Sequence, residues 1–378
     1  MPTYYGNKTV FEMSLERIEY LFDEFENISV NFSGGKDSTV TLNLALMVAE
    51  KKGRLPLKVM FIDQEAEWDC TIDYMKQVMY DPRIEPYWFQ IPFRIFNATC
   101  SDEPWLNAWD VNPKITWIRE KDPISIHKNP TQTDRFGELF NALHDWIFKG
   151  KSHAVLAGVR AEESPARRTG LTKEPTYKWI TWGKVENKKR DQFVFYPLYD
   201  WSYRDVWKAI HDNSWSYCVL YDYMYQYGIS PMKMRLSNVT HETAIDSLFF
   251  LQEIEGDLWA RLTQRLRGIN TAGILKTDWK CPKELPFMFK DWQEYRDHLL
   301  ENLITDPSSK KIMLRQVELD TKNYIPEIQE KVCKYHIDMI LKNDYHGTKA
   351  TTFAASHPKE RVGKDRHHDK RDRECYKK

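Results

Sequence analysis

The residues best suited to chemistry form one run, Ser-Gly-Gly-Lys-Asp-Ser at positions 33–38. Two consecutive glycines let a backbone turn sharply and approach an anion without side-chain interference. The amides of such a turn, together with the positive end of a following helix, point at phosphate oxygens. Ser33 and Ser38 add hydroxyl donors, and Lys36 adds a cation. Because the spacing GxxxxGK(S/T) of the P-loop is absent, the run predicts a different kind of phosphate-binding loop.

Three more candidate residues lie where predicted strands end. Asp63 closes one apolar run, and Gly158 and Arg160 follow another. Ligands of α/β proteins bind at the carboxyl ends of strands, so these residues are candidate ligand contacts. Two structural interpretations stay open. Asp63 could serve just as the cap of the next helix, and Arg160 could serve just as the partner of a neighbouring glutamate in a surface ion pair.

The elements that must position these residues alternate between strand and helix. Apolar and alternating runs predict strands at 28–32, 58–63, 87–91, 154–158 and 192–198, and helices at 39–50, 68–80 and 136–148. This alternation is typical of a parallel sheet with helices on both faces. The predicted fold class is therefore α/β, a doubly wound parallel sheet.

The rest of the chain predicts an insertion, a helical domain and a tail. Residues 99–135 are rich in Pro, Asn, Asp and Trp and indicate an insertion near the carboxyl edge of the sheet. After residue 225 no strand is expected, whereas helical patterns recur at 240–255, 257–267, 308–318 and 325–342. The predicted domains are an α/β domain over 1–225, a helical domain over 226–356 and a basic, flexible tail over 357–378.

Composition limits the classes of protein and site. The 378 residues carry 55 Lys and Arg against 55 Asp and Glu, so a chain that is basic overall and coats nucleic acid is excluded. No apolar run reaches the ~18 residues of a membrane span, and the first ten residues lack a secretory signal, which predicts a soluble cytoplasmic protein. The six cysteines form no CxxC pair, so no local zinc or iron–sulfur site is expected and no residue is assigned to a metal.

The run at 33–38 resembles the pyrophosphate loop of the adenine nucleotide α-hydrolase, or PP-loop, superfamily. Other segments are similar to the branch that contains phosphoadenosine-phosphosulfate (PAPS) reductases: FIDQE at 61–65, GVRAEES at 158–164, PLYDWS at 197–202 with Asp205, Val206 and Trp207, and Met234-Arg235. Over nearly its whole length, including the helical C-terminal region, the chain resembles the PAPS reductase-like proteins of the immunoglobulin-binding regulator A type from enterobacterial prophages.

The resemblance implies roles for particular residues. The loop and its surroundings would bind ATP or a PAPS-like adenine nucleotide, with Mg²⁺ accompanying the nucleotide and without an iron–sulfur cluster. Catalytic roles would fall to Lys36, Asp37 and Arg160, and the nucleotide-binding residues would be Ser33, Gly34, Gly35, Lys36, Asp37, Ser38, Asp63, Gly158 and Arg160. Proteins of the regulator A type often accompany a ParB-like nuclease-fold partner, through which nucleic acid could be reached.

The resemblance leaves three functions open. The first is cleavage of ATP at the α-phosphate to activate an acceptor, in sulfur transfer or nucleic-acid modification. The second is thiol-dependent PAPS reduction, but the ECGLH segment of those reductases is reduced here to Glu374-Cys375. The third is a regulator that senses a nucleotide and acts with a ParB-like partner.

Some residues have plainer expected roles. Asp200 and Trp201 are expected to be structural, because the turn before a capped helix needs such residues. His336 is expected in a helical core. Arg261 and Arg265 are expected on a solvated basic face, with contact to nucleic-acid phosphates as the alternative.

Overall fold

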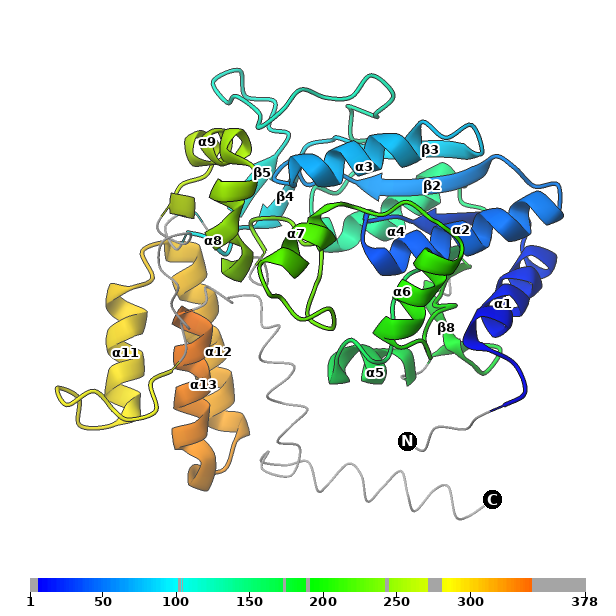
Figure 1. Cartoon of the computed structure of the whole chain (residues 1–378). Helices are drawn as coiled ribbons and strands as arrows, with labels where there is room; N and C mark the ends of the chain where they lie inside the picture. Colours follow the sequence, from blue (N-terminus) through cyan, green and yellow to red (C-terminus); the bar gives the residue numbers. More distant parts are fainter. Residues whose placement is uncertain are drawn as a thin grey trace, which may run out of the picture. The chain divides into compact units, whose positions relative to one another are not determined.

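The computed structural model describes residues 6–100, 103, 105–172, 175–187, 191–241, 245–270 and 281–341 (Figure 1). They divide into two compact units that alternate along the chain. The first unit contains residues up to Ile95, Asn107–Val239 and Leu251–Arg265, and the second contains Phe96–Leu106, Thr240–Phe250 and the residues from Leu266 on.

A seven-stranded sheet forms the centre of the first unit, in the order β3-β2-β1-β6-β9-β8-β7. Its strands are β1 (Ile28–Asn31), β2 (Leu57–Ile62), β3 (Ile84–Phe89), β6 (His153–Ala157), β7 (Thr176–Tyr177), β8 (Ile180–Asn187) and β9 (Gln192–Phe195). The five strands β3, β2, β1, β6 and β9 pair in parallel. The predicted parallel sheet is confirmed.

Burial on both faces is typical of strands at the centre of such a sheet. Of the four residues of β1, three are buried, and so are five of the six in β2. β2 reads as a nearly continuous apolar run, as strands covered on both faces do, whereas β1 alternates and buries the small polar Ser29. The antiparallel strands β8 and β7 extend the sheet beyond β9 and were not predicted.

Helices cover the two faces of this sheet (Figure 1). α2 (Lys36–Lys51) joins β1 to β2, α3 (Asp69–Met79) joins β2 to β3, and α4 (Phe136–Ile147) returns the chain from β3 to β6 on the far side of β1. Because such crossovers are right-handed, α2 and α3 lie on one face and α4 on the other. The doubly wound class is confirmed, and the strand order changes direction between β1 and β6.

The face that carries α2 also holds the first helix and the one after β9. α1 (Val10–Glu24) packs on α2, and α2 packs on α6 (Tyr203–Asp212). α1 begins at Thr9 and α6 at Ser202 with reciprocal capping boxes, which satisfy amides that the helices leave unpaired. α5 (Pro165–Thr172), α7 (Leu220–Gln226) and α9 (Gly256–Arg265) complete the helices of the first unit.

The predicted insertion at 99–135 contains a strand. This strand, β5 (Trp105–Ala108), pairs with β4 (Phe93–Phe96), which precedes the insertion, in a separate two-stranded sheet. Trp109, next in the chain after β5, is completely buried. The indole Nε1 of Trp109 donates a hydrogen bond of 2.7 Å to the carbonyl of Asp63, so part of the insertion is anchored at the end of β2.

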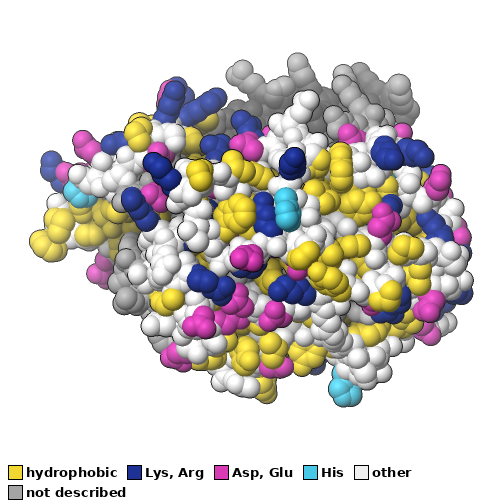
Figure 2. Space-filling model, turned by 90° about the horizontal axis from the view of Figure 1, so that it is seen from above, with side chains coloured by type: hydrophobic (Ala, Val, Ile, Leu, Met, Phe, Trp, Pro, Cys, Tyr) yellow, Lys and Arg dark blue, Asp and Glu magenta, His cyan; other side chains and the backbone are white. Residues whose placement is uncertain are grey.

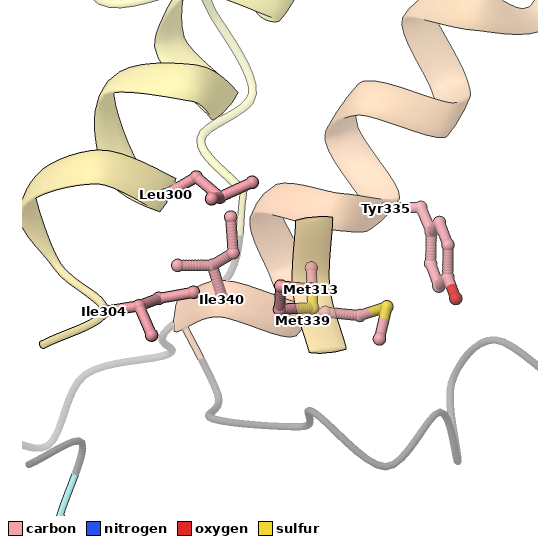
Figure 3. Packing of buried hydrophobic residues seen from close by; sticks show 6 residues of the cluster. All are labelled: Leu300, Ile304, Met313, Tyr335, Met339 and Ile340. Atoms are coloured by element: carbon pink, nitrogen blue, oxygen red, sulfur yellow. The ribbon is translucent and has the colours of Figure 1, made fainter. Parts of the chain in front are cut away.

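The second unit is helical, as expected. It contains α11 (Trp292–Asn302), α12 (Pro307–Asn323) and α13 (Gln329–Leu341), with α8 (Ile245–Ile254) shared between the units. Figure 3 shows its core, built from side chains on and next to these helices: Leu300, Ile304, Met313, Tyr335, Met339 and Ile340. α11 was not predicted, because seven of its eleven residues are polar or charged.

His336 lies in this helical unit, as the sequence predicts. It is fully buried, and its Nε2 lies 3.0 Å from a carboxylate oxygen of Asp320. Among the helices of the described ranges, none is long and apolar enough to cross a bilayer.

Candidate functional site

The run at 33–38 forms the turn from β1 into α2. Gly34 adopts φ of 73°, a left-handed conformation that glycine accepts without strain. The hydroxyl of Ser38 donates to the carbonyl of Gly35 at 2.8 Å, and the Oγ atoms of Ser33 and Ser38 lie 3.1 Å apart. The N-cap residue Gly35 has no side chain that could cap α2, and the first amide of the helix, that of Lys36, donates to the hydroxyl of Tyr221. The predicted strand, loop and helix are all present.

Lys36 is the cation of this loop, and it is only 3% exposed. Its Nζ donates to the carbonyl of Met234 at 3.1 Å and lies 3.1 Å from Oδ2 of Asp37. An ammonium group has three N–H bonds, so these two partners leave one N–H for a ligand.

Arg160 comes from the end of β6 and joins the same cluster. Its Nε forms an ion pair with Oδ1 of Asp37, and its Nη1 lies 2.9 Å from Glu162. Burial opposes the charge of Arg160, but Asp37 and the nearby glutamates raise its pKa overall. Among the described residues its Nη2 has no hydrogen-bond partner, and that nitrogen remains a donor. Asp37 thus links the two cations.

Gly158 makes this arrangement possible. A Cβ on Gly158 would lie 2.6 Å from the backbone carbon of Asp37 and 2.6 Å from the nitrogen of Ser38. Carbon atoms do not approach backbone that closely, so only glycine lets the end of β6 touch the loop. The candidate residues from β1 and β6 therefore meet at the point where the strand order changes direction, which is where open α/β sheets bind ligands.

Tyr221 is a site residue that sequence reasoning missed. Its hydroxyl oxygen accepts a hydrogen bond of 2.9 Å from the amide of Lys36 and another from the amide of Leu236. Burial, and then the charge of Asp37, raise its pKa well above the ordinary tyrosine value, so the hydroxyl keeps its proton. Because the oxygen accepts twice, the hydroxyl hydrogen is the part of Tyr221 left to donate. Nothing in the local sequence marks this residue.

Asp63 lies at the end of β2, as predicted, and is completely buried. Its Oδ2 accepts hydrogen bonds from the indole of Trp88 at 3.0 Å and from Gln90 at 2.9 Å. Its Oδ1 accepts from the amide of Glu65 at 2.9 Å and forms an ion pair with Arg119. The structure therefore places Asp63 in a network of protein groups at the sheet edge, one strand away from the loop.

Glu65 extends this network to α9. It is fully buried, and its carboxylate accepts from Nε of Arg265 at 2.8 Å and from the amide of Trp109 at 2.6 Å. Arg265 is 11% exposed, and Arg261 pairs with Asp69. The prediction that these arginines form a solvated basic face is wrong for Arg265, because its guanidinium neutralises the buried carboxylate of Glu65. The same ion pair leaves Arg265 unsuited to the alternative role, contact with nucleic-acid phosphates.

Glu67 is a buried carboxyl near Asp63 that forms no ion pair with an arginine among the described residues. Burial, and next the charge of Asp63, raise its pKa from the ordinary 4.5 to about 8, against the opposing effect of Arg119. Its side chain accepts a hydrogen bond from Asn238. Glu67 is therefore mostly protonated at neutral pH, which limits the net charge at this edge of the sheet.

Comparison with known proteins agrees with this geometry. Residues 27–90 and 110–227 match the phosphoadenosine phosphosulfate reductase domain, and residues 228–325 match a domain of unknown function, DUF3440. The first match contains both the loop at 33–38 and Arg160. The chain belongs to the PAPS reductase-like family of PP-loop proteins.

Individual relatives are similar over different lengths. An uncharacterised protein of Escherichia coli, YbdN, is 28% identical over 78% of this chain and 75% of its own. Subunit 2 of the sulfate adenylyltransferase of Mycobacterium tuberculosis is 27% identical over 50% of this chain, which spans only 55% of that subunit. Among solved structures, a PAPS reductase from Candida auris is 16% identical, with 59% of this chain and 94% of that chain covered and a TM-score of 0.30.

One family segment has a structural role in this PAPS reductase-like chain. In PLYDWS at 197–202, Asp200 receives both Nη atoms of Arg17 at 2.7 Å, and the indole of Trp201 donates to Oγ of Ser14 at 2.8 Å. The segment thereby holds α1 against the turn before α6. The expectation that Asp200 and Trp201 are structural is confirmed.

The tail carries the remaining feature of the PAPS reductase-like pattern. Cys375 and the tail at 357–378 lie outside the described residues. Within the described ranges, no three His, Cys, Asp or Glu side chains gather as metal ligands do.

Proposed function

We propose that this PAPS reductase-like protein binds ATP or a related adenine nucleotide at residues 33–38 and cleaves it at the α-phosphate to activate an acceptor. One observation carries the proposal: Lys36, which follows β1, and Arg160, which follows β6, meet at the switch point through a shared Asp37. Homologous enzymes of this family handle adenylyl and sulfonucleotide groups, as their names state.

The groups that remain free to donate suit a pyrophosphate. Lys36 keeps one N–H, Arg160 keeps its Nη2, and Tyr221 keeps its hydroxyl hydrogen. All three are held by other protein groups before any ligand arrives. Donors that are fixed in place stabilise charge as it develops on a leaving group without the cost of reorganisation. In this proposal they hold the β- and γ-phosphates, and pyrophosphate is the leaving group.

Mg²⁺ is expected to accompany the nucleotide rather than to occupy a site made by the protein alone. Magnesium in phosphate-transfer sites is commonly bound by one or two carboxylates together with phosphate oxygens. Asp37 is the carboxylate of the loop itself, and it is shared between Lys36 and Arg160. It is therefore the residue that would complete the coordination of a phosphate-bound Mg²⁺.

The finer parts of the function remain proposals. We propose that the activated acceptor is used in sulfur transfer or in nucleic-acid modification. By the resemblance to the regulator A type, we also propose that a ParB-like partner brings the protein to nucleic acid. A sensing role would use the same nucleotide site without turnover. Thiol-dependent reduction of PAPS is the second candidate, and Glu374-Cys375 is the sequence feature that favours it.

Calorimetry of Lys36 variants tests nucleotide binding. In Lys36→Met, which keeps most of the apolar stem, affinity for a non-hydrolysable ATP analogue should fall tenfold to a hundredfold, since a charge-assisted phosphate contact contributes roughly 1.5–3 kcal/mol. The matched control is Lys51→Met at the other end of α2, where the lysine is exposed and pairs with Glu19. Unchanged affinity in a folded Lys36→Met protein would contradict the site.

A further inference from the structure

Two cysteines lie next to each other behind the phosphate loop. Cys70 is in the first turn of α3, and Cys218 lies just before α7. The sulfur of Cys218 is 3.7 Å from the carbonyl oxygen of Cys70 and 3.7 Å from the hydroxyl of Thr71. The side chain of Cys218 thus contacts the backbone of a residue 148 positions away in the chain, and both cysteines are free thiols.

The two thiols also interact with each other. A hydrogen bond between them raises the pKa of Cys70 and lowers the pKa of Cys218. The amide of Leu220 and the hydroxyl of Thr71 further favour the thiolate of Cys218. Cys218 is completely buried, whereas Cys70 is partly exposed and gives a small oxidant its entry. The reactivity of a cysteine depends on its thiolate character and on its access to solvent. In this pair Cys218 has the greater thiolate character, and Cys70 has the access.

Each thiol is joined to a residue that supports the loop. Thr71, next to Cys70, places its Cγ2 methyl 3.4 Å from the position that a Cβ of Gly34 would occupy. Tyr221, three residues after Cys218, holds the amide of Lys36 through its hydroxyl. A change in the distance between the two sulfurs therefore moves Tyr221, which contacts the loop, and Thr71, which lies beside Gly34.

We propose that Cys70 and Cys218 form a dithiol that is reversibly oxidised to a disulfide, and that the disulfide weakens nucleotide binding at residues 33–38. The second part rests on the proposed function, whereas the first part does not. A disulfide brings two sulfurs to about 2 Å, which is closer than a hydrogen-bonded pair of thiols. The contact between Cys218 and Thr71 is then lost, and Tyr221 shifts relative to Lys36.

The chemistry requires an external oxidant, for which hydrogen peroxide is the simplest class. One thiolate attacks a peroxide oxygen, the O–O bond breaks, and a sulfenic acid and one water form. The second thiol then attacks the sulfenic sulfur, the S–O bond breaks, and a second water leaves. The two thiols lose two electrons and two protons in total, and one peroxide becomes two waters. A dithiol reductant reverses the reaction by thiol–disulfide exchange.

Peptide mass spectrometry tests the modification itself. The full chain is treated with hydrogen peroxide, remaining thiols are alkylated, and the digest is searched for a peptide pair linked through Cys70 and Cys218. The pair should form, disappear with dithiothreitol, and be absent from Cys70→Ser and Cys218→Ala. It should persist in Cys281→Ser, a matched control at a partly buried free thiol outside the pair. Oxidation of both cysteines to separate sulfinic acids, or linkage to other cysteines instead, would overturn the proposal.

Calorimetry with a non-hydrolysable ATP analogue tests the coupling. The disulfide form should bind about tenfold more weakly than the reduced form, which is the loss of one good hydrogen bond to phosphate. Dithiothreitol should restore the affinity, and Cys218→Ala should be insensitive to peroxide. Equal affinity of the two forms would refute the coupling. A reduced protein that binds no nucleotide would instead refute the proposed function, while the linked peptide still decides the disulfide.

Discussion

Glu67 shows how one buried side chain ties stability to pH. Its pKa rises from 4.5 to about 8 through burial and the charge of Asp63, so the folded protein keeps a proton that the unfolded chain releases. Between these two values the folded state binds more protons than the unfolded state. The stabilising contribution of Glu67 is therefore fully present below pH 4.5 and is lost as the pH rises from 4.5 to about 8. Above about pH 8 the free energy of unfolding no longer changes with pH on account of Glu67.

We expect Glu67→Gln, which cannot ionise, to flatten the dependence of stability on pH between 5 and 8. Denaturant melts at several pH values measure this, with Glu284→Gln at an exposed position as the control. Buried His144, whose pKa falls to about 4 through burial, acts in the opposite direction between pH 4 and 6.5, but it is common to all three proteins. Identical profiles for the wild type and Glu67→Gln would show that Glu67 does not stay protonated in the fold.

Among elements, the contact between β6 and the loop before α2 sets the shape of the site. Gly158→Ala would push a methyl group against the backbone of Asp37 and Ser38, which has no flexible end that could move aside. We expect a loss of about 1–3 kcal/mol of stability, as for overpacking, and loss of most nucleotide affinity. Thermal melts and calorimetry measure the two effects.

Gly137→Ala is the matched control for this substitution. Gly137 lies in α4 with nothing within 4 Å of its Cβ position, so alanine should leave binding unchanged and stabilise the helix by roughly 0.5–1 kcal/mol. A Gly158→Ala protein that binds nucleotide as tightly as the wild type would mean that β6 can move away from the loop.

The elements also show what the sequence could and could not predict. The loop and its flanking strand and helix were predictable, because apolar runs and paired glycines are local signals. β8, with the sequence ITWGKVEN, was missed because it is partly exposed and interrupted by polar residues. Tyr221 and Arg119 reach the site through contacts to residues 185 and 56 positions away, and no local pattern records such pairings.

At the scale of the whole molecule, the formal charges are balanced in number. Acidic and basic side chains are interspersed on the face shown in Figure 2, as the equal totals of 55 and 55 allow. A protein that binds nucleic acid through phosphates needs several basic groups free to replace counterions. Arg265 and Arg261 are instead engaged with Glu65 and Asp69. This distribution supports the proposal that any contact with nucleic acid goes through a partner.

The products of turnover distinguish the candidate functions of the full chain. If residues 33–38 hold the β- and γ-phosphates, charge develops on departing pyrophosphate, where Lys36 and Arg160 already lie. We expect ATP turnover, in the presence of a suitable acceptor, to give AMP and pyrophosphate, and PAPS with a thioredoxin system to give little sulfite. Nucleotide chromatography and a sulfite assay measure both. ADP and orthophosphate that depend on Lys36 would indicate kinase-like cleavage, whereas thioredoxin-dependent sulfite formation that is abolished by Cys375→Ser would establish the reductase, because only that reaction needs a nucleophilic thiol.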